Sequence, residues 1–346
     1  MRHLVARRPT LALALLSVLC SLGSLTSALA AGPTNDVPVE PKQVRAWLMR
    51  IHEAASQRNF QGTFVVTAGG AVSSARIAHF YEGGNYFERI ESLDGPVRQV
   101  FRHNDQVQTM WPQSRVAMIE QREPVSSFPA LLQSDAERIA ELYDVRPQGT
   151  DRVAGQEANV LTLRPRDAYR FGYRLWADRA TGLLLRADVL GERGEMLESS
   201  AFSDVVIGVR PQPESVLSPM RKLDGYRVLR PTLVQTKLET EGWSLPQVVP
   251  GFRQVSCVKR PLDVAAEDDQ RAPSVQAVHT IFSDGLTYVS VFIEPFSRER
   301  HTKPVLTAIG ATHTLMRQQG DWWVTVVGDV PALTLRAFAS ALERKK

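Results

Sequence analysis

From Asn59 onward the chain is a succession of short segments rich in β-branched and aromatic residues. Turn-forming residues separate them, among them Gly83-Gly84 and Asp94-Gly95-Pro96. Short strands with turn signals at this spacing indicate an antiparallel sheet or a partial barrel. From residue 158 to residue 208 the breaks are again short and polar, which is typical of a meander and not of βαβ units.

Three helices are expected around these strands, which makes the predicted fold class α+β. The first follows residue 41, where one face is apolar at helical spacing. A capping box at Ser134–Glu137 predicts a short second helix. A third begins near Asp329-Val330-Pro331, where Asp suits a cap and Pro the first turn. The expected buried residues are Val44, Trp47, Leu48, Ile51 and Ala55, then Ile139, Leu142 and Tyr143, then Leu335, Phe338, Ala339 and Leu342.

A Pro-rich stretch divides the chain into two predicted domains. Residues 209–222 hold three prolines, and we assign 209–226 as a linker. Residues 31–208 then form a large β domain, and residues 227–346 form a small α+β domain with a terminal helix. Inside the small domain, Ser283-Asp284-Gly285 is predicted to be a hairpin turn, and Gln318–Asp321 a second one.

The first thirty residues are predicted to be a Sec-type signal peptide. Arginines precede an apolar run, and the small residues at Ala28 and Ala30 suit cleavage after Ala30. An uncleaved membrane anchor is the alternative. Without this leader, 38 basic side chains face 37 acidic ones, a balance that argues against a general nucleic-acid binder. Cleavage also leaves Cys257 as the single cysteine, expected to be a buried thiol in a protein with no internal disulfide.

The motifs of common enzymes are missing from the sequence. His52-Glu53 begins like a zinc-protease helix, but Ser56 stands where the second metal ligand belongs. Gly242–Pro246 lacks the second glycine of a nucleophile elbow, and there is no phosphate-binding glycine loop. We therefore expect no metal, no cofactor and no enzymatic activity. A hydrolase without a visible motif is the alternative.

Arginines interleaved with aromatic residues indicate instead a binding surface in the first sheet. Guanidinium groups pair with phosphate or carboxylate, and aromatic rings hold acyl chains, so an anionic amphiphile is the expected ligand. The alternative is simple strand alternation, with charges outside and rings in the core. The candidate lipid-binding residues are Phe64, Arg76, Phe80, Phe87, Arg89, Arg98 and Arg102.

The order of several segments resembles the MucB/RseB family of periplasmic negative regulators of the envelope-stress sigma factor in Gram-negative bacteria. The resemblance covers nearly the whole mature chain and rests on structural signatures, none of them catalytic. The segments are NFQGTFVV, ESLDGPVRQVFRHNDQV, YRLWADRATGLLLRADVLGERGEMLESSAFSDV, HTIFSDGLTYVSVFIE and VVGDVPALTLRAFASALE.

This resemblance implies a large N-terminal unclosed antiparallel β-barrel with covering helices, similar to lipoprotein carriers, followed by a small α+β domain. It also implies a periplasmic protein that binds the periplasmic domain of a membrane-spanning anti-sigma factor and shields it from the first protease. Lipopolysaccharide-like or other lipid signals would loosen the complex. A homo-oligomer is expected, and a periplasmic lipid or lipoprotein carrier is the alternative function.

We expect the partner to bind near the junction of the two domains. The candidate contacts there are aromatic residues, because aromatic residues dominate binding hot spots. Trp322 and Trp323 are neighbours in one predicted strand and point to opposite faces, so at least one of them is expected in the core. The candidate partner-binding residues are Trp243, Tyr288, Trp322 and Trp323.

Overall fold

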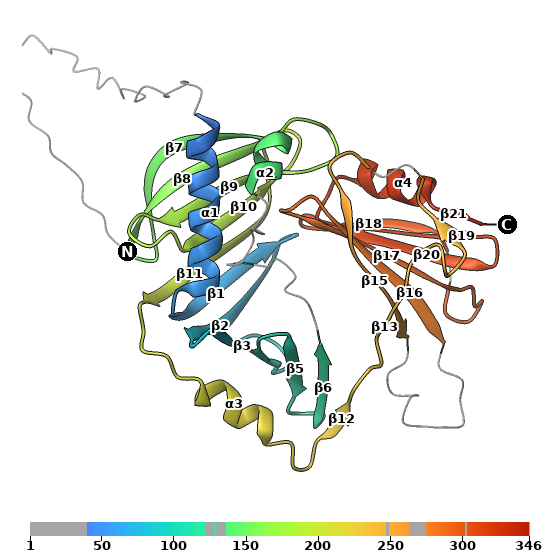
Figure 1. The fold of residues 1–346 in the computed structure, drawn as a ribbon, viewed down its shortest axis with the longest axis horizontal. Helices are drawn as coiled ribbons and strands as arrows, with labels where there is room; N and C mark the ends of the chain where they lie inside the picture. The colour runs from blue at the N-terminus through green and yellow to red at the C-terminus, as the bar shows by residue number, and fades with distance from the viewer. Residues whose placement is uncertain are drawn as a thin grey trace, which may run out of the picture. The chain divides into compact units, whose positions relative to one another are not determined.

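The computed structural model describes residues 40–121, 128, 136–246, 249–262, 275–301 and 303–345. These residues form two large β-sheets with a few helices packed on them (Figure 1). The predicted signal peptide and the capping residue Ser134 lie outside the described residues. No helix within the described part of the chain is long and apolar enough to cross a membrane.

The large sheet contains 12 strands in the order β12-β6-β5-β4-β3-β2-β1-β11-β10-β9-β8-β7. Its pairs are antiparallel, except that β12 runs parallel to β6. Among the described residues the two edge strands, β12 and β7, do not pair with each other, so the sheet is unclosed as predicted. The strands are β1 (Phe60–Ala68), β2 (Ala71–Glu82), β3 (Asn85–Ser92), β4 (Gln99–His103), β5 (Gln106–Trp111), β6 (Val116–Gln121), β7 (Tyr143–Val153), β8 (Gln156–Pro165), β9 (Gly172–Asp178), β10 (Leu184–Leu190), β11 (Met196–Ile207) and β12 (Arg227–Leu229).

The turns of this sheet follow the predicted glycine positions. Gly83 and Gly84 connect β2 to β3 with φ angles of 59° and 79°. Both angles lie in the left-handed region that a two-residue hairpin turn needs, and glycine adopts it without steric cost.

One face of the large sheet packs against α1 (Pro41–Gln57) and α2 (Ala136–Leu142). In Figure 1, α1 runs across strands of this sheet. Val44, Leu48 and Ile51 are at most 5% exposed and pack with the α2 residue Ile139 against β7–β10. The predicted apolar stripe of the first helix is therefore confirmed, and Trp47 packs at its border.

The opposite face of the sheet is covered by α3 (Glu214–Arg221). Val216 of this helix is fully buried. Its partners come from β2 to β6: Phe80, Phe87, Phe101, Met110 and Ala117. The stretch predicted as a linker thus contains a helix with its own hydrophobic contacts, and β12 of the large sheet follows it. The domain limits themselves stay a prediction.

The second sheet has seven strands in the order β13-β15-β16-β17-β20-β19-β18. Helix α4 (Ala332–Ala341) packs on it through Leu335, Phe338 and Ala339, as the helical spacing predicts. Strands β14 (Trp243–Ser244) and β21 (Glu343–Arg344) form a separate pair. The seven strands are β13 (Val234–Gln235), β15 (Arg253–Pro261), β16 (Gln276–Ser283), β17 (Tyr288–Pro295), β18 (Val305–Ile309), β19 (Thr312–Gln319) and β20 (Trp322–Gly328).

Both hairpins predicted in this part of the chain are present, since β16 pairs with β17 and β19 with β20. Cys257 lies in β15 as a buried free thiol. Burial raises the pKa of this thiol, which disfavours the reactive thiolate. The prediction of a structural cysteine is confirmed.

Candidate functional site

A cavity of about 610 Å³ is lined by residues of both large sheets. Strands β1, β2, β3, β9, β10 and β11 contribute one part of its wall. The start of β17, the end of β20 and the residue Thr312 contribute another part. The apolar lining consists of Phe64, Val66, Ala75, Ile90, Phe128, Ala187, Val189, Leu286 and Val327.

Strand alternation explains why these side chains meet. Phe64 lies opposite Ala75 of β2, and Ala75 lies opposite Ser92 of β3, so the three share one face of the sheet. The Phe64 ring packs 5.7 Å from the ring of Phe128 and 6.4 Å from that of Phe202. The sequence predicts Phe64 as a lipid-binding residue, and Phe64 lines this cavity. It does not predict Phe128, which follows the last strand of its segment and carries no periodic signal.

Charged groups interrupt the apolar lining at two places. Arg98 lies at the cavity beside Asp94, which accepts hydrogen bonds of 2.5 Å from the backbone N–H and the hydroxyl of Ser74. These bonds lower the pKa of Asp94. Elsewhere in the wall, burial first and the nearby Asp329 second raise the pKa of Glu198. The cavity therefore combines an apolar interior with ionic groups, as a site for an amphiphile requires.

The hairpin between β16 and β17 joins the two sheets through a buried ion pair. Asp284 at its turn is fully buried, and its Oδ2 lies 3.0 Å from Nε of Arg170, which is also fully buried. Arg170 donates a second hydrogen bond of 2.8 Å to the carbonyl of Pro250 and pairs with Asp167. The ion pair is well satisfied, which is the condition for a buried charge pair to be stable.

Neighbouring side chains of the same hairpin close the junction. Leu286 is 1% exposed and belongs to the hydrophobic core that α1 and α2 form with the large sheet. The hydroxyl of Tyr143 lies 3.3 Å from Asp284 Oδ2. Burial first, and then the charge of Asp284, raise the pKa of Tyr143 well above its ordinary value. Because Leu286, Thr287 and Tyr288 also line the cavity, one hairpin forms both the junction and part of the cavity wall.

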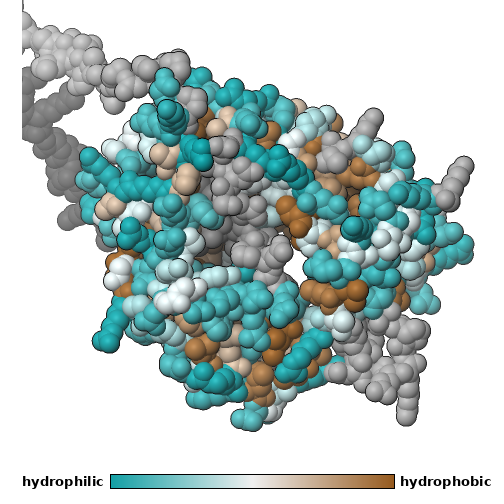
Figure 2. Space-filling view, in the orientation of Figure 1, coloured by the Kyte–Doolittle hydropathy of each residue, from teal (hydrophilic) through white to brown (hydrophobic). Residues whose placement is uncertain are grey.

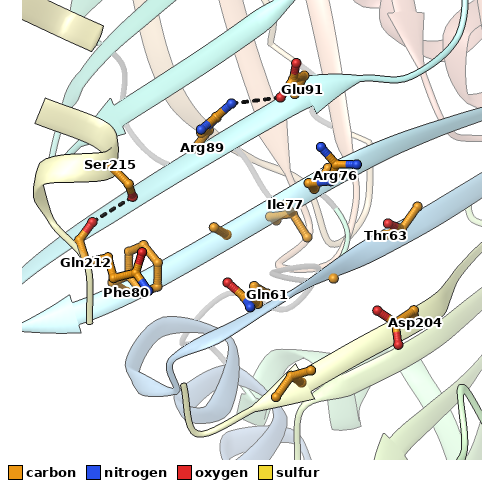
Figure 3. Close-up of a pocket in the computed structure, with 13 residues that line it drawn as sticks. Gln61, Thr63, Arg76, Ile77, Phe80, Arg89, Glu91, Asp204, Gln212 and Ser215 are labelled. Atoms are coloured by element: carbon orange, nitrogen blue, oxygen red, sulfur yellow. Dashed lines mark hydrogen bonds and ion pairs between the residues drawn. The ribbon is translucent and has the colours of Figure 1, made fainter. Parts of the chain in front are cut away.

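Three predicted lipid-binding residues lie elsewhere, on the opposite face of the large sheet. Arg76, Phe80 and Arg89 line a smaller cavity of about 320 Å³ near the start of α3 (Figure 3). Arg89 is paired there with Glu91 at 2.9 Å. Arg76 is one residue from Ala75, so the two-residue period of a strand sends it to the other side from Phe64.

The structure therefore does not bring the predicted lipid-binding residues together at one cavity, and lipid binding by them stays a prediction. Phe80 and Phe87 are 1% and 6% exposed and pack beneath α3. Arg102 lies at neither cavity; its guanidinium stacks 5.5 Å from the Tyr86 ring centroid. Of the seven predicted lipid-binding residues, Phe64 and Arg98 line the large cavity.

The aromatic residues predicted to contact a partner are mostly in the core. Trp243 is fully buried and meets Trp322 edge to face at 5.8 Å between ring centroids. Trp323 is 4% exposed and stacks on His301 at 4.8 Å, on the other face of β20. The prediction that Trp322 and Trp323 point to opposite faces is confirmed. Tyr288 lines the large cavity, where sequence spacing alone did not place it.

No group of three or more His, Cys, Asp or Glu side chains among the described residues is arranged to hold a metal ion.

Figure 2 shows a mainly hydrophilic face with hydrophobic residues in small groups, one of them over α3 and β12.

The sequence and the fold match known proteins over nearly all of the described chain. The sequence model of the MucB/RseB N-terminal domain matches residues 43–220, and that of the MucB/RseB C-terminal domain matches residues 237–343. The chain is 32% identical over 340 residues to the sigma factor AlgU regulatory protein MucB of Pseudomonas aeruginosa, covering 94% of this chain and 98% of that protein. It is 25% identical over 299 residues to the sigma-E factor regulatory protein RseB of Escherichia coli K12, covering 86% and 90%.

Two solved structures have the same fold over 88% of this chain and 99% of theirs. The complex of Pseudomonas aeruginosa MucA and MucB superposes with a TM-score of 0.67 at 29% identity. MucB in complex with MucA(peri) superposes with a TM-score of 0.65 at 28% identity. An unclosed sheet followed by a smaller α+β sheet is thus the fold of a class of proteins named as sigma-factor regulators. This chain belongs to the MucB/RseB family.

Proposed function

We propose that this protein is a periplasmic negative regulator of an envelope-stress sigma factor. It binds the periplasmic domain of a membrane-spanning anti-sigma factor and shields it from the first protease of the release cascade. The names of its relatives and the solved MucA/MucB complexes support the choice of partner. The leader at residues 1–30 supports export.

We propose further that an amphiphile such as lipopolysaccharide or a lysophospholipid enters the 610 Å³ cavity and weakens partner binding. The observation that carries this step is the cavity wall, because the hairpin residues Leu286 and Tyr288 line it while Asp284 holds the junction. A ligand that displaces this hairpin acts on both sheets at once. Such a switch requires the amphiphile and the partner to prefer different arrangements of the junction.

The test is to fill the cavity and measure the shielding of the partner. Ala75→Trp places a large ring beside Phe64, whereas Arg76→Ala removes a side chain at the smaller cavity of the opposite face. The full mature chain is mixed with the periplasmic domain of the anti-sigma factor from the same bacterium, the protease, and lipopolysaccharide or lysophosphatidylglycerol. Ala75→Trp should keep the partner shielded at amphiphile concentrations that expose it in the parent and in Arg76→Ala.

Equal release by the parent and by Ala75→Trp would place the lipid signal outside this cavity. The alternative function, a periplasmic lipid or lipoprotein carrier, is favoured by the same apolar cavity. A carrier would transfer fluorescent lipid between vesicles and would leave the anti-sigma domain unbound in a pull-down. Sedimentation of the mature chain tests the proposed homo-oligomer.

A further inference from the structure

The edges of the two large sheets differ in how well they are protected against pairing with another chain. Natural sheets protect their edges with short strands, charges, prolines or bulges. At the edges of the large sheet, β12 has three residues, and β7 carries charged side chains and a register shift after Pro147. At the first edge of the small sheet, β13 has two residues.

The remaining edge, β18, has none of these protections. Its sequence, VLTAI, contains no charge and no proline. Its pairing with β19 is regular along all five residues. Val305 and Ile309 are 39% and 69% exposed. The turn after Ile309 packs against the β1–β2 hairpin, since a Cβ on Gly310 would lie 2.8 Å from Cβ of Ala68. The open stretch is therefore Val305–Ala308.

A groove of about 340 Å³ runs beside this edge, between β18, β19 and α4. Leu306 and Leu315 supply apolar side chains that also pack on the core of the small sheet. Arg317 and Arg336 line the same groove. Backbone groups for pairing, an apolar floor and two cations are thus close together.

The positive charges beside β18 have no ion-pair partner among the described residues. No carboxylate there pairs with Arg317 or Arg336, and Nε of Arg317 is buried without a hydrogen-bond partner. Lys303, just before the strand, is exposed and adds a third positive charge. A second copy pairing along this edge would bring like charges together, which is unfavourable.

We propose that β18 is a docking edge for an extended segment of another protein that alternates apolar and acidic side chains. The segment adds as a further strand, with its backbone on Val305–Ala308 and its carboxylates on Arg317 and Arg336. Main-chain hydrogen bonds supply affinity in this mode of recognition, and side chains supply specificity. The inference stands on the small sheet alone. If the proposed regulatory function is correct, a stretch of the anti-sigma domain is a candidate for this segment.

The test uses fluorescent peptides of about eight residues, a common strand length, with the full mature chain. One peptide alternates Val and Glu, a second alternates Val and Lys, and a third is the Val–Glu peptide with alternate backbone nitrogens methylated. Fluorescence anisotropy should show the Val–Glu peptide binding about tenfold or more tightly than the other two. Arg336→Glu should weaken its binding by a similar factor, whereas Arg253→Glu, at the far side of the sheet, should not.

Equal binding of the Val–Glu and Val–Lys peptides would overturn the charge assignment. Undiminished binding of the methylated peptide would overturn strand addition. Sedimentation of the chain alone decides the remaining alternative: a dimer that dissociates in Leu306→Glu would make a second copy the occupant and would overturn the proposal. None of these measurements uses the anti-sigma domain or a lipid, so their failure is distinct from a failure of the proposed function.

Discussion

Arg170 lies in the loop between β8 and β9 of the large sheet, and Asp284 lies in the turn between β16 and β17 of the small sheet. Each charge is stable in the interior because the other compensates it. Their side chains are fully buried, 114 positions apart in sequence, and 3.0 Å apart in space. Removing one partner of such a pair leaves the other charge uncompensated in the interior, which costs more than the pair contributes when intact. An exposed pair such as Arg179 and Glu157 has water to replace the lost partner.

We therefore expect Asp284→Ala to lower the free energy of unfolding by about 3–5 kcal/mol. Glu157→Ala, the matched control at the exposed pair, should lower it by less than about 1 kcal/mol. Urea denaturation of both variants measures the difference. A loss at Asp284 no larger than the loss at Glu157 would mean that the buried pair does not hold the junction.

Tyr143 adds a pH dependence at the same junction. Its pKa is raised in the folded protein by burial and by Asp284, so the unfolded chain loses the phenolic proton at a lower pH. The stability from the neutral phenol is complete below the ordinary tyrosine pKa of about 10 and is lost as pH rises toward the folded pKa. The free energy of unfolding should therefore fall above about pH 10.

The variant Tyr143→Phe removes one such phenol and should flatten this alkaline decrease. Tyr173, whose pKa is also raised by burial, keeps part of it. Denaturation curves at several alkaline pH values measure the slope. An unchanged slope in Tyr143→Phe would assign the decrease to other groups.

At the scale of elements, the β16–β17 hairpin contributes to three parts of the molecule. Its strands belong to the small sheet, and its turn residue Leu286 lies in the core of the large sheet. Tyr288, at the start of β17, lines the cavity. Because one short element contributes to all three places, a change in its packing alters the junction and the cavity together.

Leu286→Ala should accordingly weaken the junction, with a cost of about 2–5 kcal/mol for a leucine deleted from a core. Under the proposed function, the amphiphile concentration needed for partner release should fall. Each 1.4 kcal/mol by which the substitution weakens the junction corresponds to about a tenfold decrease in the amphiphile concentration needed for release. The protease assay measures this concentration, with Leu333→Ala, which truncates a leucine that is 50% exposed, as the control. Identical release by both variants would contradict a role for the hairpin in the switch.

At the scale of the whole molecule, the segment that connects the two large sheets makes structural contacts of its own. Helix α3 covers Phe80, Phe87 and Phe101, and β12 then extends the large sheet. Shortening residues 211–219 would remove part of α3 and expose this core, so it would disturb folding as well as any coupling between sheets. Variants at the β16–β17 hairpin leave α3 and the core beneath it unchanged.

Local sequence patterns predict most elements of this protein, but not α3, which lies in the stretch predicted as a linker. Alternation and turn residues predict the strands and hairpins, helical spacing predicts the stripe of α1 and the contacts of α4, and ordered segments identify the family. These signals are short-range, because each depends on the period of one element and on the residues that end it.

The tertiary structure decided which elements meet and which face each side chain reaches. Phe64 and Phe80 look equivalent in sequence, yet the strand period and α3 place one at the cavity and the other in a core. Asp284 is identifiable as a turn residue, but its burial depends on Arg170, which lies in the loop between β8 and β9 of the large sheet. Contacts between residues this distant in sequence depend on the packing of whole sheets, which no local period encodes.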